Sequence, residues 1–313
     1  MTEVEHRPSI EPAAITDRAF GALLGLAIGD AIGTTLEFRA RDTYSPLTDM
    51  GGGGPFGLKA GEWTDDTAMA LALADSLQAR DDFDEQDLLG RFTDWWQSGT
   101  YSCTGKCFDI GITTRRALLR WQSTKEPHCG STDPMSAGNG SLMRLAPVAV
   151  RFWKDRIRLR DVAGRQSKTT HGAAEAVDAC IAFADILADA IAGRSRSEVL
   201  RPRTEHYVGA IGLIMRGLWR AKARTEIRST GYVAHSLEAA LWCVGHTPDF
   251  RNAVLTAANL GEDADTTAAI TGQLAGALYG ASGIPANWVS QVAWRDQIKA
   301  KAASLMGKAT EKF

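Results

Sequence analysis

The stretch FGALLGLAIGDAIG at residues 20–33 decides the fold. Its apolar residues recur at i, i+3 and i+4, which predicts a helix within residues 16–38. Four glycines recur along it every four residues and therefore share one face of the helix: Gly21, Gly25, Gly29 and Gly33. Each glycine costs a helix about 0.5–1 kcal/mol relative to alanine. We therefore expect another backbone to pack very closely against this face.

Similar helical patterns cover most of the remaining chain, separated by short turns that contain glycine or proline. They occupy residues 64–77, 88–96, 110–121, 142–153, 173–191, 207–223, 236–244, 250–259 and 266–279. No alternating polar and apolar stretch longer than about four residues stands out, as a β-sheet would require. We predict an all-α fold with one compact domain at residues 15–305, a disordered N-terminal tail at 1–14 and a C-terminal tail at 306–313.

The composition is that of a globular protein with little net charge. The 313 residues contain 35 Lys and Arg against 37 Asp and Glu, a formal charge of −2. This balance argues against a nucleic-acid-binding protein, which needs a large basic excess. Five scattered cysteines without a secretory signal predict free thiols and a reducing, cytoplasmic location. The longest apolar run, residues 20–28, is shorter than the roughly 20 residues that cross a bilayer, so we expect no membrane span.

Two acidic segments resemble each other: GEWTDDTA at residues 61–68 and GEDADTTA at residues 261–268. They lie 200 residues apart, and five of their eight positions are identical. In each, carboxylates and threonines precede an Ala-rich helix, where they can cap the helix and interact favourably with its dipole. Capping explains one aspartate per helix but not the crowding, because neighbouring carboxylates repel each other. The alternative is a site for a hard divalent cation such as Mg²⁺, Mn²⁺ or Ca²⁺, and the residues alone leave both interpretations open.

A glycine-rich turn, SAGNGS at residues 136–141, leads into the helical pattern at 142–153. Backbone N–H groups at a helix start can bind phosphate, although such a turn is also typical of an ordinary cap after a loop. His171 precedes another helix, where it can contact a phosphate or ribose, or simply cap the helix. The basic run at residues 151–160 is interpreted as a solvated face, with a docking patch as the alternative.

Six segments between residues 20 and 279 follow one another in an order that is specific when taken together. They are GALLGLAIGD through EF at residues 21–38, WTDDT at 63–67, CFDIG at 107–111, GNGSLMR at 138–144, GY with SLEAALW at 231–242, and GEDADT at 261–266. In this order they resemble the ADP-ribosylglycohydrolase family, in particular its bacterial dinitrogenase-reductase-activating branch. One position departs from that branch: Ile112 stands where asparagine is common, and this bears on the linkage that is cleaved.

The resemblance implies a compact, single-domain, all-α fold with a metal-lined cleft that binds ADP-ribose. It implies two divalent cations, Mg²⁺ or Mn²⁺, with the ligands Thr64, Asp65, Asp66, Asp263, Asp265 and Thr266. It assigns the chemistry to Asp109 and Glu37. It assigns substrate binding to Gly138, Asn139, Gly140, Ser141, His171 and Tyr232.

The activity that the resemblance implies is hydrolysis of the N-glycosidic bond between ADP-ribose and a modified protein side chain, with arginine preferred, which reverses mono-ADP-ribosylation. The partners are then an ADP-ribosylated protein and ADP-ribose, with no nucleic acid and no membrane. Two alternatives keep the same cleft: hydrolysis of serine-linked, O-acetylated or toxin-derived ADP-ribose, and catalytically silent binding of ADP-ribose. The intact acidic segments argue against the silent binder, which has little reason to keep crowded carboxylates.

Overall fold

The glycine-faced helix is α1, Pro12–Gly33, and it packs antiparallel against α12, Ala264–Tyr279. In the computed structural model, which describes residues 11–310, each α1 glycine faces a small residue of α12. The facing pairs are Gly21 with Gly276, Gly25 with Gly272, Gly29 with Ala268, and Gly33 with Ala264. A Cβ atom on Gly25 would lie 2.1 Å from the carbonyl oxygen of Gly272, so only glycine fits there. The predicted close approach of a second backbone is therefore confirmed.

Fourteen α-helices and five short 3-10 helices account for the regular structure of the described residues, which contain isolated β-bridges but no strand. Besides α1 and α12, the α-helices are α2 (Asp65–Ala79), α3 (Glu85–Ser98), α4 (Ile112–Thr124), α5 (Ala146–Phe152), α6 (Arg156–Thr170), α7 (Ala174–Ile191), α8 (Arg196–Val199), α9 (Gly209–Met215), α10 (Val233–His246), α11 (Phe250–Ala258), α13 (Ala286–Gln291) and α14 (Arg295–Thr310). The all-α prediction is confirmed.

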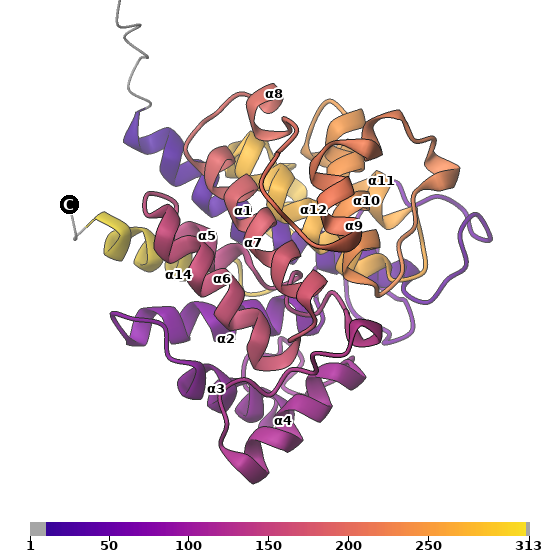
Figure 1. The fold of residues 1–313 in the computed structure, drawn as a ribbon. Helices are drawn as coiled ribbons and strands as arrows, with labels where there is room; N and C mark the ends of the chain where they lie inside the picture. The colour runs from indigo at the N-terminus through magenta and orange to yellow at the C-terminus, as the bar shows by residue number, and fades with distance from the viewer. Residues whose placement is uncertain (1–10, 311–313) are drawn as a thin grey trace, which may run out of the picture.

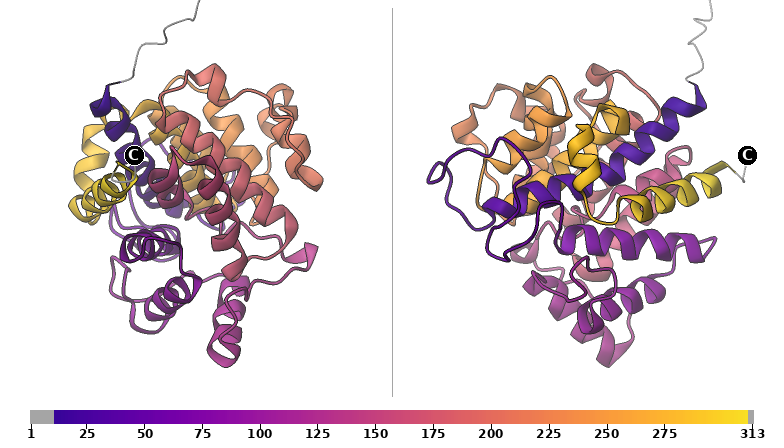
Figure 2. Two further views of the ribbon diagram at one scale, coloured as in Figure 1. Left: turned by 60° about the vertical axis from the view of Figure 1, so that its left-hand side comes forward. Right: turned by 180° about the vertical axis from the view of Figure 1, so that it is seen from behind.

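The remaining helices surround the α1–α12 pair. In Figure 1, α2, α3 and α4 lie below α1, while α9, α10 and α11 gather on the right around α12. The view from behind in Figure 2 shows α1 and α12 side by side, with α14 beside α2. One continuous hydrophobic core links these layers. The antiparallel pairing places the C-terminal end of α1 beside the N-terminal end of α12, and the site forms there.

The helix bounds extend beyond the expected domain limits of residues 15 and 305. Helix α1 begins at Pro12, where proline suits the first turn because it needs no N–H partner. Helix α14 runs to Thr310, because Leu305, Met306 and Ala309 are buried. The expected tails otherwise fall on residues 1–10 and 311–313, which lie outside the described residues.

The segment Pro12–Leu36 is long and apolar enough to cross a membrane by length and composition alone. The expectation drawn from residues 20–28 does not hold by this test, because Asp30 is one charge within a longer apolar window. That window is 89% buried inside the protein, so close packing against the core accounts for its composition.

Candidate active site

The N-terminus of α2 is capped by Asp30, a carboxylate from the neighbouring helix α1. Asp30 is fully buried and accepts four hydrogen bonds, two from Thr64 and two from Thr67. The backbone N–H groups donate at 2.9 and 3.0 Å, and the two hydroxyls at 2.8 and 2.6 Å. Thr64, the N-cap residue of α2, makes no capping bond with its own side chain. Its hydroxyl donates to Asp30 instead, and the same oxygen lies near Asp66 and Asp265.

The N-terminus of α12 is capped in the same way by Glu37, which follows the end of α1. Its Oε2 accepts the N–H of Ala264 at 2.7 Å and that of Asp265 at 3.2 Å. Asp263, the N-cap residue of α12, makes no side-chain capping bond. The interpretation of Thr64 and Asp263 as ordinary caps of their own helices is therefore wrong, because Asp30 of α1 and Glu37, just beyond α1, supply the caps for the two helix starts.

The two capped helix starts bring their carboxylates together. Asp30, Asp66 and Asp265 offer oxygen atoms that all lie within 4.8 Å of one another, and so do Glu37, Asp263 and Asp265. The hydroxyl oxygen of Thr64 lies 3.3 Å from Asp66 Oδ2, and that of Thr266 lies 3.4 Å from the same atom. Asp66 Oδ1 is buried without a hydrogen-bond partner among the described residues. A buried, unpaired carboxylate oxygen among other oxygen donors suits a hard divalent cation.

Burial and mutual repulsion disfavour the charged forms of these carboxylates. Burial, and then the neighbouring carboxylates, raise the pKa values of Asp65, Asp66 and Asp265 well above the ordinary value. Burial and the charge of Asp263 raise the pKa of Glu37 to about 8. Burial also raises the pKa of Asp109 to about 6. The cluster therefore needs either bound protons or bound cations, and its all-oxygen donor set fits cations such as Mg²⁺ or Mn²⁺.

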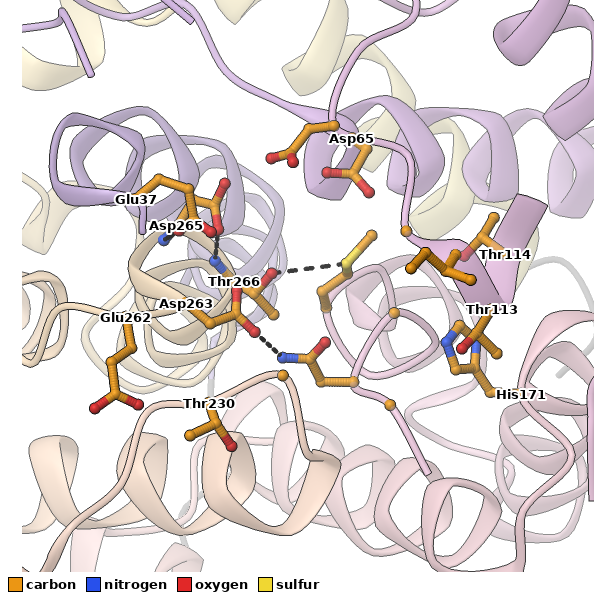
Figure 3. Close-up of a pocket in the computed structure, with 18 of the residues that line it drawn as sticks. Glu37, Asp65, Thr113, Thr114, His171, Thr230, Glu262, Asp263, Asp265 and Thr266 are labelled. Atoms are coloured by element: carbon orange, nitrogen blue, oxygen red, sulfur yellow. Dashed lines mark hydrogen bonds between the residues drawn. The ribbon is translucent and has the colours of Figure 1, made fainter. Parts of the chain in front are cut away.

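A cleft of about 600 Å³ opens above this acidic cluster, a size typical of small-ligand pockets. Figure 3 shows the acidic side chains on one side and Thr113, Thr114 and His171 on the other. The predicted site residues that line it are Glu37, Asp65, Asp109, Gly138, Asn139, Gly140, His171, Asp263, Asp265 and Thr266. Thr64 and Asp66 lie buried beneath its floor, within the acidic cluster.

Three residues that line the cleft hold the left-handed backbone conformation without being glycine. Their φ angles are 61° for Phe38, 59° for Asp109 and 59° for Glu262. Two of them are tied together, since the N–H of Phe38 donates to the carbonyl of Glu262 at 2.8 Å. Such strained residues persist where the surrounding structure holds them, and they often occur at functional sites. Here they set the shape of one end of the cleft.

The glycine-rich turn forms the wall opposite the acidic residues. Asn139 joins the two walls, because its Nδ2 donates to Asp263 Oδ2 at 2.7 Å and to Ser236 Oγ at 2.8 Å. Within the described residues no hydrogen bond uses the N–H of Gly140, which lines the cleft. The prediction that the turn leads directly into a helix is wrong. Further turns follow, and α5 begins only at Ala146 with Pro147 in its first turn.

Two predicted binding residues lie away from the main cleft. The hydroxyl of Ser141 is fully buried 2.8 Å from that of Ser167, so its side chain points into the core. Tyr232 lines an adjoining hollow of about 580 Å³, together with Gly138 and Gly231, and its hydroxyl donates to Glu175. Gly138 and Gly231 line both spaces, so a ligand long enough could extend from the cleft to Tyr232.

The sequence of the described residues matches a known protein family. The sequence model of the family described as ADP-ribosylglycohydrolase matches residues 11–312. The chain belongs to the ADP-ribosylglycohydrolase family. The resemblance inferred from the six segments is therefore confirmed, and with it the class of enzyme.

Two curated relatives and one solved structure extend this match. The ADP-ribosylarginine hydrolase Tri1 of Pseudomonas putida (strain GB-1) is 46% identical, over 97% of this chain and 81% of the relative. The ADP-ribosyl-[dinitrogen reductase] glycohydrolase of Rhodospirillum rubrum is 33% identical, over 89% of this chain and 91% of the relative. A structure described as an ADP-ribosylglycohydrolase-related protein complex is 36% identical, with a TM-score of 0.86 over 95% of this chain and 100% of that chain.

Sequence reasoning missed several residues of this ADP-ribosylglycohydrolase site. Asp30 belongs to the GALLGLAIGD segment but received no predicted role at the site, although a carboxylate within a buried apolar stretch is itself a signal of a function. Thr113, Thr114 and Thr230 line the cleft from loops and helix starts that carry no sequence signal of their own. Ile112, the departure from the branch pattern, also lines the cleft and is 71% exposed.

Proposed function

We propose that the protein hydrolyses the N-glycosidic bond between ADP-ribose and an arginine side chain of a modified protein. The convergence of two capped, acidic helix starts on a cleft whose opposite wall is a glycine turn carries this proposal. ADP-ribose offers the matching chemistry, with ribose hydroxyls for the acidic side and a diphosphate for backbone N–H groups. The name of the Tri1 relative at 46% identity supports arginine as the linkage.

Two divalent cations, Mg²⁺ or Mn²⁺, fit the acidic cluster. Thr64, Asp65, Asp66, Asp263, Asp265 and Thr266 would hold them. Bound there, the cations supply positive charge for the ribose hydroxyls and for water, which is what such sites contribute to hydrolysis. The unpaired Asp66 Oδ1 and the raised pKa values of the cluster support this assignment.

Asp109 and Glu37 would perform different tasks in the reaction. Asp109 lines the cleft with its pKa near 6, so at neutral pH it can accept a proton from water or, once protonated, give it to the leaving nitrogen. Glu37 uses Oε2 to hold the start of α12, which fixes Asp263 and Asp265 in place. Its task is to hold these aspartates in position, and Glu37 also lines the cleft itself.

The wall opposite the cluster would bind the diphosphate and the nucleoside. Gly138, Asn139, Gly140 and the backbone of Ser141 form the turn, and the free N–H of Gly140 can donate to a phosphate oxygen. His171 lines the same wall. Tyr232, in the adjoining hollow, could stack on the adenine at the far end of the ligand. Remote binding of this kind holds the anomeric carbon in place for hydrolysis.

The test is release of ADP-ribose from an arginine-modified protein in the presence of Mg²⁺ or Mn²⁺, followed by chromatography. We expect turnover by the wild type and loss of turnover in Asp65→Asn combined with Asp265→Asn. The exposed substitution Asp94→Asn serves as the matched control and should leave turnover unchanged. Absence of turnover by the wild type, or full activity in the double variant, would contradict the proposal.

The same assay decides between the alternatives. Faster release from serine-linked peptides, O-acetyl-ADP-ribose or a toxin-modified protein would assign the cleft to that substrate instead. Binding of ADP-ribose by calorimetry without any hydrolysis would identify a silent binder. We further propose a cytoplasmic location, since all five cysteines are free and a reducing compartment keeps them so.

A further inference from the structure

His171 lies against the glycine turn, and the Thr170 hydroxyl contacts the far side of its ring. His171 is 3% exposed and lines the cleft. A Cβ atom on Gly140 would lie 2.7 Å from Cε1 of the ring and 3.1 Å from Nε2, and one on Gly138 would lie 3.3 Å from Nε2. The Cε1–Nε2 edge therefore lies over the turn. The other ring nitrogen, Nδ1, points away from the cleft and lies 2.8 Å from the hydroxyl of Thr170.

Behind Thr170 lies Arg144, whose side chain is fully buried and stacks on the ring of Phe92 at 4.6 Å. Among the described residues, no carboxylate lies within ion-pair distance of its guanidinium, which donates only to neutral acceptors. One of its N–H groups donates to the carbonyl of Gly140 at 3.1 Å, and another to the Thr170 hydroxyl at 2.9 Å. Arg144 thus contacts both the glycine turn and the group that holds His171.

The direction of these hydrogen bonds determines whether Nδ1 of the His171 ring carries a proton. A guanidinium can only donate, so the Thr170 oxygen must accept from Arg144. The Thr170 hydroxyl is fully buried, and its remaining partner among the described residues is Nδ1 of His171. If Nδ1 carried a proton, both groups would offer hydrogens and the Thr170 proton would lack an acceptor. Every buried group is satisfied when Thr170 donates to an unprotonated Nδ1.

We propose that Arg144 and Thr170 are positioning residues that fix neutral His171 as the Nε2–H tautomer, so that its ring donates a hydrogen bond into the cleft. Burial, assisted by the charge of Arg144, lowers the pKa of His171 to about 3, which agrees with a neutral ring. The identity of the acceptor rests on the proposed function: Nε2–H and the Gly140 N–H then donate to the diphosphate of ADP-ribose. The opposite tautomer would place a lone pair towards this anion and weaken binding.

The tautomer can be measured without any substrate. The full-length protein is labelled with ¹⁵N in its histidine rings, and long-range ¹H–¹⁵N correlation spectra are recorded, with His171→Gln used to identify the His171 signals. In the wild type we expect Nε2 in the protonated range and Nδ1 in the unprotonated range. Detection of Nδ1–H in the wild type would overturn the proposal, whatever the variants do.

Variants of Thr170 test whether its hydroxyl fixes the tautomer of His171. Thr170→Val removes the hydroxyl at nearly constant volume, so the Nδ1–H form should appear in the spectrum. The KM for an ADP-ribosylarginine peptide should then rise about tenfold, as for loss of a hydrogen bond to a charged group. The kcat should stay within about twofold, because the contact is made equally in the ground and transition states. Thr170→Ser keeps the hydroxyl and should restore the wild-type tautomer and KM.

Thr169→Val is the matched control. The Thr169 hydroxyl is buried on the same helix and also accepts from Arg144, at 3.3 Å, but it makes no hydrogen bond to His171. Its removal should leave the His171 signals unchanged. A wild-type tautomer in Thr170→Val, or an equal change in Thr169→Val, would overturn the assigned role of Thr170. If the wild type shows Nε2–H but releases no ADP-ribose, the proposed function fails while the tautomer assignment stands.

Discussion

Asp30 and Arg144 are fully buried charged residues whose hydrogen-bond partners are all uncharged. Asp30 accepts bonds from two threonine hydroxyls and two backbone N–H groups. Arg144 donates to backbone carbonyls, threonine hydroxyls and Gln166. Buried charges without an ion-pair partner are costly unless such a full set of hydrogen-bond partners exists. Each therefore fixes the geometry of its partners, Asp30 on the acidic side of the cleft and Arg144 on the side of the glycine turn.

The buried imidazole of His171 predicts a specific dependence of stability on pH. Its pKa is lowered from the ordinary value of 6.5 to about 3 by burial and by Arg144. Between these values the unfolded chain binds a proton that the folded protein does not, so stability falls as the pH drops below 6.5. From pH 7 to pH 5 we expect a loss of about 2 kcal/mol from this residue.

The measurement compares urea unfolding of the wild type and His171→Asn at pH 7 and pH 5. Titration of all other groups contributes similarly to both proteins, so the difference between them isolates the imidazole. The wild type should lose about 2 kcal/mol more than the variant over this interval. Equal losses in the two proteins would show that the ring takes up a proton in the folded state.

At the residue scale, the sequence predicts those candidate site residues whose chemistry is concentrated in short motifs. Asp65, Asp66, Asp263 and Asp265 stand out because crowded carboxylates need an explanation. The direction of a side chain carries no such signal: Ser141 shares the motif of Gly140, yet its hydroxyl points into the core. Asp30 caps a helix start 34 residues away, a contact that only the packing of α1 against α2 creates.

Helices α1 and α12 predict a large effect of a single methyl group. Gly25→Ala would place a Cβ atom 2.1 Å from the carbonyl oxygen of Gly272, and neither backbone can move without disturbing the core. We expect the free energy of unfolding to fall by about 3 kcal/mol, at the upper end of the range for overpacking. Because the same contact places α12 beside Asp30 and Glu37, activity should fall as well.

The matched control for this change is Gly307→Ala in α14, where the added Cβ meets no atom of the described residues within 4 Å. Alanine is the better helix former, so this variant should be unchanged or up to about 1 kcal/mol more stable. Urea unfolding of both variants beside the wild type measures the contrast. A Gly25→Ala protein as stable as the Gly307→Ala protein would refute close backbone packing between α1 and α12.

The aspartates that cap α2 and α3 should respond very differently to replacement by asparagine. Asp84 caps its own helix α3 at a half-buried position, accepting from two backbone N–H groups, and asparagine is as good a cap as aspartate. Asp30 accepts with both oxygens inside the core, so an asparagine NH₂ group would meet another donor. Asp30→Asn should cost about 1–3 kcal/mol and most of the activity, while Asp84→Asn should cost little of either.

Unfolding by urea and ADP-ribose release, both with saturating Mg²⁺, measure this pair of variants. Saturating cation is used because it offsets the repulsion between Asp30 and its acidic neighbours, which would otherwise mask the loss of the cap. If the two variants lost equal stability and activity, Asp30 would be no more than an ordinary cap.

At the element scale, apolar periodicity predicted many of the buried helices but not α6, α8, α13 or α14. Helix α6 begins within the basic run at residues 151–160, which was interpreted as a solvated face. That interpretation is wrong for Arg151, which is 4% exposed. Arg156 and Arg160 remain in contact with solvent, but their guanidinium groups also pair with Asp185 on α7. The sequence of a basic run predicts an exposed face because the acidic partners of its arginines lie in another helix. The periodicity of a single segment cannot reveal such pairing.

At the scale of the whole molecule, the site depends on joining distant parts of the chain. The carboxylates come from segments around residues 30, 65 and 265, and each segment is placed by the packing of α1 against α2 or α12. Folding therefore assembles buried like charges, which costs free energy unless a cation or protons are bound. The stability of the molecule and the occupancy of its site should consequently be linked.

This linkage predicts that divalent cations raise the melting temperature of the wild type. Mg²⁺ or Mn²⁺ at about 100 times its Kd stabilises a protein by about 2.7 kcal/mol, or about 5 °C in Tm for a chain of this size.

The substitution Asp66→Asn should change which protein, the variant or the wild type, has the higher melting temperature, depending on whether cations are present. Without cations the variant should melt above the wild type, because one repelling buried carboxylate is gone. With cations it should melt below the wild type, because a ligand is missing. Thermal unfolding in EDTA and then with Mg²⁺ or Mn²⁺ measures both, with NaCl at equal ionic strength and the exposed Asp94→Asn as controls. An equal rise in melting temperature with NaCl would contradict cation binding by the acidic cluster. So would an Asp66→Asn variant that is less stable than the wild type in EDTA.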